Sequence, residues 1–218
     1  MDQLIFKFPF SKKYYEQDFY VASNNFSAYN LIESWPNWPG KWLNIFGSKG
    51  SGKTHLSKIL EKKIDKIKLI EAKDVKNEII EDLTNLDCLI IDSYNNNIDE
   101  KLLYSILNQS KQLENYILIN TITSINNSNI ILNDLKSRIE SFLFIGIDLP
   151  TDDLLKVIIS KTLSEKQIKI NPKLSDYIVN NVERSYEKMF KFLKDVDDLS
   201  LSTGKSININ LIKKVLNQ

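Results

Sequence analysis

The chain has 218 residues, 42% of them apolar, which suffices for one large domain or for a domain with a small second one. Its formal net charge of +1 provides no overall basic field to attract nucleic acid. No stretch approaches the roughly 18 apolar residues of a membrane span, and the start does not resemble a signal peptide. The single cysteine, Cys88, lies in an apolar run, which predicts a buried structural thiol in a reducing cytoplasm.

Residues 1–12 form an apolar segment that we predict to be a separate N-terminal tail. One interpretation is an edge strand or a tail folded onto the core. The other is a short peptide that docks in a partner's groove, because a terminal segment can extend at little cost to the fold. The tail resembles the motif that binds the bacterial sliding clamp, with the candidate clamp-binding residues Gln3, Leu4, Phe6 and Phe8.

The next segment, residues 14–34, predicts one helix, which Ser23 or Asn24 would cap. Trp35-Pro36-Asn37-Trp38-Pro39-Gly40 then ends it, because proline and glycine stop helices. We interpret the two tryptophans as a structural lid on the sheet edge rather than as a ligand site.

The stretch Gly47-Ser48-Lys49-Gly50-Ser51-Gly52-Lys53-Thr54 fits the P-loop pattern G-x-x-x-x-G-K-[ST] in full. A predicted strand over 41–46 precedes it, and apolar residues at helical spacing follow, so a chance match is disfavoured. Glycines let the backbone turn tightly and point its N–H groups at a phosphate, and the helix start adds its dipole. We therefore predict that ADP or ATP binds here, with Lys53 at the β/γ-phosphates and the Thr54 hydroxyl on Mg²⁺. The candidate nucleotide-binding residues of this loop are Gly47, Gly50, Ser51, Gly52, Lys53 and Thr54.

A strand over 67–70 and a helix over 72–83 are predicted next, followed by a continuous apolar run that ends at Asp92. A run without alternation is typical of a parallel strand that is buried on both faces. At the carboxyl end of such a strand, Asp92 can hold Mg²⁺. The alternative is a loop aspartate that caps the next turn.

Residue 93 is a serine, whereas many ATPases of this type carry a second acid there to activate the attacking water. A hydroxyl cannot act as a general base near neutral pH without activation. Asp99 and Glu100 are better suited to the start of the next helix, where acids favour the dipole. We therefore expect weak intrinsic hydrolysis.

Two more helices, over 99–114 and 133–140, and two more strands, over 116–121 and 142–147, complete the predicted sheet domain. The strand 116–121 ends in Asn120 and Thr121, where a γ-phosphate sensor belongs, although simple turn chemistry explains these residues equally well. The second helix carries Arg138, which by residue type alone would be a surface salt-bridge partner.

Beyond Asp148 the pattern is entirely helical, with four predicted helices, the second opened by Asn171-Pro172 and the fourth by Asn208. The predicted fold is α/β, a parallel sheet flanked by helices over residues 13–148 with a small C-terminal helical lid over 149–218.

Together these features resemble the AAA+ ATPases, in particular the group of the bacterial replication initiator DnaA and its short Hda-type relatives. Residues 18–24 resemble the segment that lies along the adenine in that group. Residues 35–39 are similar to a tract of alphaproteobacterial Hda-like proteins, and residues 135–139 resemble the initiator's arginine-finger segment.

The resemblance implies a regulator that is tethered to the sliding clamp and stimulates ATP hydrolysis by DnaA, which prevents re-initiation. Arg138 would be an arginine finger in trans, and the chain's own nucleotide would hold its conformation. The resemblance also implies no sequence-specific DNA binding, because the initiator's helix-turn-helix domain is not in this sequence. An initiator-like lid sensor would fall at Glu187 or Lys188, so Arg184, one turn earlier, is the candidate substitute.

Alternatives remain open at this point. The chain could be a nucleotide-gated AAA+ adaptor, or a helicase-loader-type ATPase that acts on another replication partner. A small-molecule P-loop kinase is disfavoured, because such kinases usually carry an arginine-rich lid. Homo-oligomerisation is also left open.

Overall fold

The computed structural model describes residues 15–165, 168 and 170–217. These residues form two compact units, 15–148 and 149–217, each of which has its own hydrophobic core.

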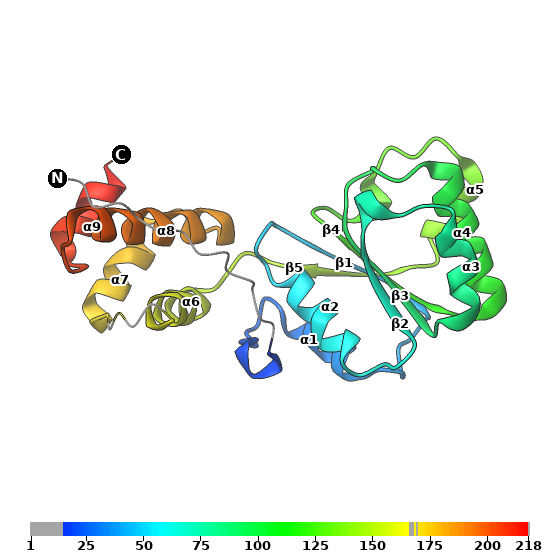
Figure 1. Cartoon of the computed structure of the whole chain (residues 1–218), viewed down its shortest axis with the longest axis horizontal. Coiled ribbons are helices and arrows are strands. Elements are labelled where there is room, and N and C mark those ends of the chain that lie inside the picture. The colour runs from blue at the N-terminus through cyan, green and yellow to red at the C-terminus, as the bar shows by residue number, and fades with distance from the viewer. Residues whose placement is uncertain (1–14, 166–167, 169, 218) are drawn as a thin grey trace. The chain divides into compact units, whose positions relative to one another are not determined.

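The first unit contains a five-stranded parallel sheet in the order β2-β3-β4-β1-β5 (Figure 1). The P-loop strand β1 therefore lies between β4 and β5, and β3 pairs with β4. This arrangement confirms the predicted α/β fold with a parallel sheet. The strands are β1 Trp42–Gly47, β2 Ile67–Glu71, β3 Cys88–Tyr94, β4 Tyr116–Thr121 and β5 Leu143–Ile147.

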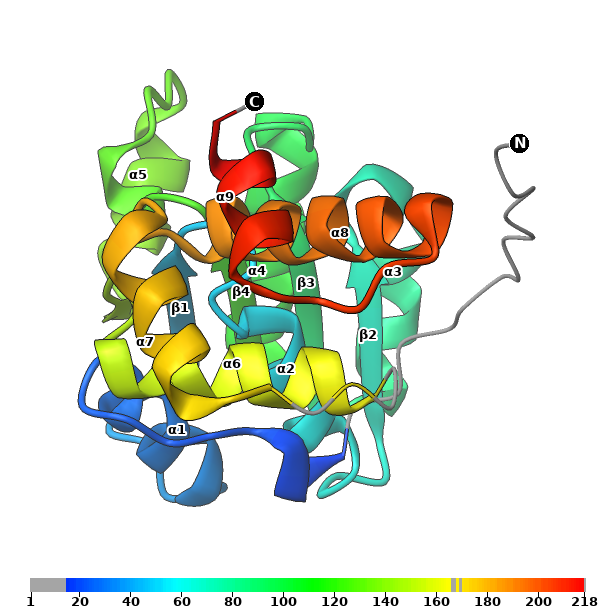
Figure 2. The same ribbon diagram turned by 90° about the vertical axis from the view of Figure 1, so that its left-hand side faces the viewer.

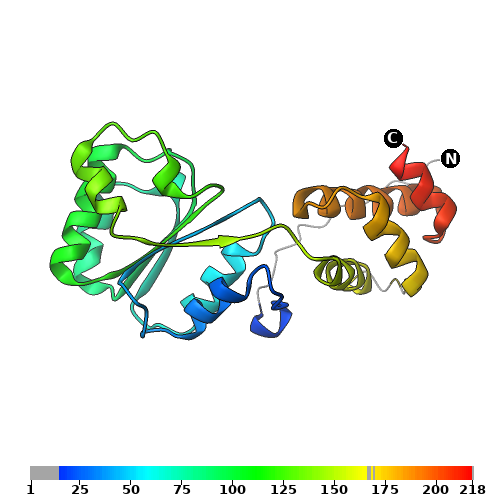
Figure 3. The same cartoon turned by 180° about the vertical axis from the view of Figure 1, so that it is seen from behind.

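Helices cover both faces of this sheet (Figures 1 and 3). One face packs against α1 and α2, and the other packs against α3, α4 and α5. The side chains of β3 alternate between two cores, with Leu89 and Ile91 in one and Cys88 and Ile90 in the other. Both faces are apolar, which explains why the sequence of β3 shows no alternation. The helices are α1 Phe26–Glu33, α2 Lys53–Glu61, α3 Glu78–Asp82, α4 Glu100–Leu113 and α5 Asn133–Ile139.

The prediction of one helix over 72–83 is wrong. The structure has a 3₁₀ turn at Ala72–Asp74, the short α3, and a second 3₁₀ turn at Leu83–Asn85. Val75 is extended between the first two, with φ −68° and ψ 125°. A β-branched residue and the nearby Asn77 are both weak helix formers, which explains the interruption.

The cap predicted for α1 is also wrong, because the N-cap residue is Asn25 rather than Ser23 or Asn24. The Asn25 side chain accepts a hydrogen bond from the Ala22 backbone N–H at 2.8 Å and donates to the Tyr20 carbonyl at 3.0 Å. Asn24 instead donates to the carbonyl of Asp148 at 3.2 Å, which ties the start of α1 to the chain after β5.

The tryptophans of the 35–40 segment pack with the first residue of β4, in the middle of the sheet. The rings of Trp35 and Trp38 lie 4.3 and 5.6 Å from that of Tyr116, centroid to centroid. They therefore cover the amino end of a central strand rather than an edge strand, and this corrects the predicted position.

The second unit consists of α6 Asp152–Ser164, α7 Pro172–Asn181, α8 Tyr186–Thr203 and α9 Ile209–Leu216 (Figure 2). As predicted, Asn171 caps α7 with Pro172 in its first turn, and Asn208 caps α9. The apolar faces of all four helices meet in one cluster that includes Leu155, Ile178 and Leu193. Among the described residues, no helix combines the length and the apolar character that a membrane crossing requires.

Candidate functional site

The P-loop connects the carboxyl end of β1 to α2 and depends on glycine at defined positions. Gly50 and Gly52 adopt φ values of 86° and 99°, in the left-handed region that favours glycine. A Cβ at Gly52 would also lie 2.9 Å from Cε2 of Phe19, and one at Gly47 would lie 2.8 Å from the carbonyl oxygen of Ile147. Larger residues would therefore push the loop out of this shape.

The loop also offers groups that suit an anion. Gly52 is the N-cap of α2, and no side chain caps the helix start, so the first N–H groups there lack a side-chain acceptor. The Ser48 hydroxyl is covered from solvent and has no hydrogen-bond partner among the described residues. A phosphate at this helix start would meet both kinds of donor.

Lys53 is folded back onto the loop. Its Nζ donates to the carbonyl oxygens of Gly47 at 2.6 Å and Ser48 at 3.0 Å. Burial lowers the pKa of Lys53, and the negative charge of Asp92 opposes that shift. Phosphate oxygens are stronger acceptors for an ammonium group than peptide carbonyls, so the present contacts can be exchanged for a nucleotide.

Three predicted site residues, Thr54 of α2, Asp92 of β3 and Asn120 of β4, meet at the Asp92 carboxylate. Asp92 is 2% exposed. The Thr54 hydroxyl of α2 donates to Oδ2 of Asp92 at 2.7 Å. The Asn120 side chain of β4 donates to Oδ1 at 2.8 Å, and the Ser93 backbone N–H donates to the same atom at 3.0 Å. Asp92 lies within β3 rather than in a loop, so the alternative of a loop aspartate that caps the next turn does not describe this structure.

A bulge in β3 shapes this meeting point. Ile91 pairs with Ile119 and Tyr94 pairs with Thr121, so Asp92 and Ser93 together lie opposite the single residue Asn120. Ser93 has φ 58°, in the left-handed region, although it is not a glycine. The strand thus extends two residues beyond Asp92, whereas the sequence predicted that it would end there.

Asn120 and Thr121 have different environments. The Asn120 side-chain NH₂ group also donates to the Ser57 hydroxyl of α2 at 2.7 Å, which turns it toward the P-loop helix. The Thr121 hydroxyl accepts from the side chain of Asn44 at 3.0 Å, and Asn44 in turn accepts from the Ile125 N–H. The Thr121 side chain is thus held by β1 rather than by the P-loop helix. Sequence analysis did not identify Ser57 or Asn44, because both lie within helix and strand patterns that carry no polar signal.

The Thr54 hydroxyl and the Asp92 carboxylate fit Mg²⁺, which prefers oxygen ligands. No group of three or more metal-ligating side chains occurs in the part of the chain that is described. A cation here would take its remaining ligands from nucleotide phosphates and water, as Mg²⁺ commonly does. It would neutralise charge on the phosphate oxygens.

Arg138 lies on α5, which packs on the sheet face opposite to that covered by α2. Its Nη2 donates to Oδ1 of Asn108 on α4 at 2.8 Å, so the contact is with an amide rather than a carboxylate. Leu135 and Ile139 on the same helix are buried in the core, which fixes the helix that carries the guanidinium.

Arg184 lies in the turn between α7 and α8, three positions before Glu187. Its Nη2 contacts Oδ1 of Asp152 at 2.6 Å, and both side chains are largely exposed. Glu187 and Lys188 fall in the first turn of α8. Because Arg184 belongs to the helical unit, its part in nucleotide binding stays a prediction.

The candidate clamp-binding residues lie outside the described residues and also stay predictions: Gln3, Leu4, Phe6 and Phe8. The P-loop helix does contact the segment that follows the tail. His55 Nε2 lies 2.7 Å from the Tyr15 carbonyl, and its ring meets that of Phe19 edge-on at 5.3 Å. These contacts give His55 a structural role.

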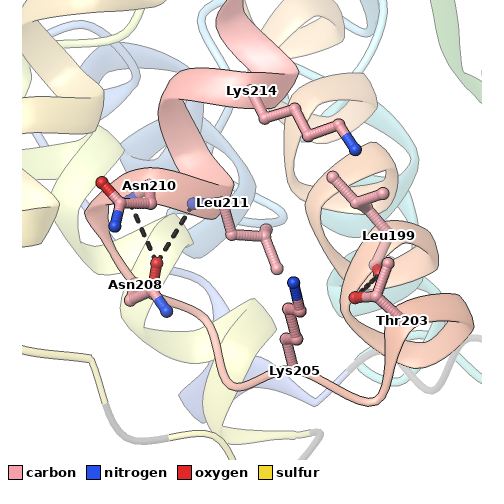
Figure 4. Close-up of a pocket in the computed structure, with 7 residues that line it drawn as sticks. All are labelled: Leu199, Thr203, Lys205, Asn208, Asn210, Leu211 and Lys214. Carbon is pink, nitrogen blue, oxygen red and sulfur yellow. Dashed lines mark hydrogen bonds between the residues drawn. The ribbon is translucent and has the colours of Figure 1, made fainter.

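The structure also contains hollows that no P-loop residue lines, and two of them bear on the predictions. A polar one of about 170 Å³ follows the carboxyl ends of β3 and β4, where Asn95, Thr123 and Asn127 are among its lining residues. The other, of about 270 Å³, lies in the helical unit between α8 and α9 (Figure 4). There the Asn208 side chain accepts from the N–H groups of Asn210 and Leu211, so its polar contacts cap a helix.

The sequence and the fold were compared with those of known proteins. Residues 152–216 match the family model described as Hda, lid domain. The chromosomal replication initiator protein DnaA of Borrelia garinii subsp. bavariensis is 28% identical over 98% of this chain and 49% of its own length. The chain thus resembles DnaA over nearly its whole length, its helical unit resembles the Hda lid domain, and its fold is that of the AAA+ module. It spans about half the length of the curated relatives that it matches.

Solved structures agree with the AAA+ fold. Domain III of the Thermotoga maritima replication initiation protein DnaA superposes with a TM-score of 0.78 at 20% identity, over 96% of this chain and 98% of that one. AMPPCP-bound DnaA from Aquifex aeolicus gives 0.68 at 20% identity, over 88% of this chain and 67% of that one. The predicted fold class, including the C-terminal helices, is thus confirmed.

Proposed function

We propose that this AAA+ protein regulates replication initiation by stimulating hydrolysis of the ATP that is bound to DnaA, while its tail tethers it to the sliding clamp. Its relation to DnaA and Hda supports the replication context and a DnaA partner. DnaA that has lost its ATP would no longer start replication, so the protein would prevent re-initiation in the cytoplasm.

In this proposal the chain's own site binds ADP or ATP with Mg²⁺ and has a conformational role. Lys53 and the start of α2 hold the phosphates, and Thr54 and Asp92 hold the cation. A DnaA structure with the same fold contains AMPPCP, which supports an adenine nucleotide. Asn120 contacts Asp92 and Ser57 and can report whether a γ-phosphate is present.

The observation that carries the proposal is the serine after Asp92. The side chains around Asp92 suit phosphate and Mg²⁺, yet Ser93 stands at the position where a catalytic acid is expected, with its backbone in the left-handed region. Such a site favours retention of nucleotide over turnover. The reaction is then expected at a partner's nucleotide, to which Arg138 supplies positive charge.

Arg138 suits that role because α5 is packed on the core and Asn108 orients the guanidinium. An arginine finger supplied in trans stabilises the charge of the transferring phosphoryl group and raises hydrolysis by about 10³–10⁵. In this reading Asn108 is a positioning residue, since it acts through Arg138.

The test uses initiator that is preloaded with labelled ATP, mixed with clamp-loaded DNA and this protein. We expect hydrolysis to rise with the wild-type protein and to fail with Arg138→Ala. Gln3→Ala should also abolish the rise, because the protein is then no longer held on the loaded clamp. If the initiator keeps its ATP in the presence of wild-type protein, the proposal is wrong, and a nucleotide-gated adaptor for another partner becomes the better account.

A further inference from the structure

We propose that Ile131 is the apolar anchor by which this protein docks onto the ATPase that Arg138 serves. Ile131 would enter an apolar recess of that partner, of a size that suits an aliphatic side chain, next to the nucleotide that the partner binds. This inference rests on the proposed function and adds the surface through which the partner is held.

Exposure is the first observation. Ile131 is 83% exposed, the highest fraction among the exposed large apolar side chains of the described residues. Single exposed apolar residues are common on protein surfaces and need no explanation by themselves. A docking role for Ile131 therefore requires a fixed backbone and suitable neighbouring residues.

The backbone at this position is fixed by a carboxylate. Oε1 of Glu100, in the first turn of α4, accepts a hydrogen bond from the Ile131 N–H at 3.0 Å. Oε2 of the same side chain accepts from the Leu132 N–H at 2.7 Å. Both bonds involve a charged acceptor and are of the stronger kind. The exposed side chain therefore extends from a backbone that two hydrogen bonds hold in place.

The neighbouring side chains force Ile131 outward. Ile130 is buried in the core of the sheet unit, and Leu132 packs against the same core with an extended backbone. Successive side chains of an extended segment point to opposite sides, so two inward neighbours leave the middle residue outside. Ile131 cannot turn inward unless Ile130 and Leu132 are withdrawn.

Such an arrangement lowers the cost of binding. An apolar side chain that is already held in its outward position loses little conformational freedom when a partner covers it. Buried anchors of this kind, surrounded by polar contacts, carry most of the affinity in many interfaces. Asn129 and Asn133 flank Ile131, and both are exposed and uncharged, which suits a polar rim.

Continuity with Arg138 identifies the partner. Leu132 is the N-cap of α5, and Arg138 follows on that helix. The six steps from Leu132 to Arg138 add about 9 Å at 1.5 Å per residue, and the extended step from Ile131 adds about 3 Å, so the two backbones are at most about 12 Å apart. An interface of ordinary size covers about 800 Å² on each partner and extends well beyond that distance. A protein whose nucleotide meets Arg138 therefore also lies against Ile131.

The test measures the affinity of the full chain for its ATP-bound initiator and, separately, the rate of initiator ATP hydrolysis at saturating protein. The variant is Ile131→Ser, with Ile131→Val to restore most of the apolar surface. The matched control is Leu113→Ser, because Leu113 is a 40% exposed aliphatic residue at the opposite end of α4 from Glu100. Thermal melting of each variant verifies the fold.

We expect Ile131→Ser to weaken binding about tenfold or more, Ile131→Val to recover most of the affinity, and Leu113→Ser to bind like the wild type. The hydrolysis rate at saturation should be unchanged by Ile131→Ser. If Ile131→Ser binds as tightly as Leu113→Ser, or if the wild type does not bind the initiator, the inference is overturned. If the wild type binds but does not stimulate hydrolysis, the proposed function fails while the affinity comparison still decides the role of Ile131.

Discussion

Two regions of the sheet unit carry the proposed chemistry. They differ in whether their functional side chains hydrogen-bond to one another inside the fold or face outward. Around Asp92 the polar groups of α2, β3 and β4 bond to one another in a buried network. On α5 and the segment before it, the core holds the backbone, and the functional side chains face outward. In the proposed account, the first region serves this chain's own nucleotide and the second serves another molecule.

Removal of the P-loop lysine should have the largest effect. In Lys53→Ala the phosphates lose their ammonium partner, so Mg²⁺ with ADP or ATP should no longer raise the melting temperature. At a ligand concentration of 100 Kd, binding stabilises a wild-type protein by about 2.7 kcal/mol, and this gain should disappear. Scanning fluorimetry measures it, with Lys49→Ala, an exposed lysine of the same loop, as the control. An undiminished nucleotide shift in Lys53→Ala would contradict the site.

The buried network should be sensitive to loss of one member. Asn120→Ala leaves the Ser57 hydroxyl without its donor and removes one of the bonds to Oδ1 of Asp92. Unsatisfied buried groups of this kind cost about 1–3 kcal/mol, so the urea midpoint should fall without nucleotide present. Asn127→Ala, at an exposed position in the loop after β4, is the control. Equal midpoints for the two variants would mean that the network contributes nothing to stability.

Substitutions on α5 should have little effect on stability but a large effect on the partner's hydrolysis. Arg138→Ala removes one hydrogen bond to Asn108 at a partly exposed position, so the free energy of unfolding should change by at most about 1 kcal/mol. Asn108→Ala should be similarly mild for stability, yet it should reduce stimulation of the partner because the guanidinium loses its orientation. Urea unfolding and the initiator assay, run on the same preparations, separate these effects. A destabilisation as large as that of Asn120→Ala would remove the contrast between the regions.

The smallest expected effect concerns Cys88 in β3. Burial raises the pKa of this thiol, and the negative charge of Asp87 adds to the shift. The pKa lies above that of a free thiol, so the thiolate that alkylating reagents attack is scarce up to mildly alkaline pH and increases only as the pH rises further. Iodoacetamide at pH 8 should therefore label the protein only after denaturation. Rapid labelling of the folded protein would show that the strand opens readily.

Sequence patterns predicted most of the framework for identifiable reasons. Fully apolar runs located β3 and β4, and Asn171-Pro172 and Asn208 marked helix starts because caps depend on local chemistry. The broken segment over 72–85 was not predicted, because apolar spacing alone suits one helix as well as three short turns.

The candidate site was predictable where a motif names its residues, as with Lys53, Thr54 and Asp92. The bulge at Ser93 and the contact of Asn120 with Ser57 depend on strand register and on the approach of α2, neither of which is local in sequence. The hydrogen bond from the Ile131 N–H to the Glu100 carboxylate joins residues that are 31 positions apart. Sequence analysis assigned Glu100 only to the start of a helix.

The most direct test of the account is the single-turnover rate of ATP hydrolysis on the initiator at saturating concentrations of wild type, Arg138→Ala and Arg138→Lys. Saturation removes differences in binding, so the rate reports the chemistry alone. The account predicts a loss of about 10³-fold or more in Arg138→Ala and little recovery in Arg138→Lys, because lysine lacks the planar fork of donors. A wild-type rate with saturating Arg138→Ala would contradict the account, since hydrolysis would then be stimulated without the proposed finger.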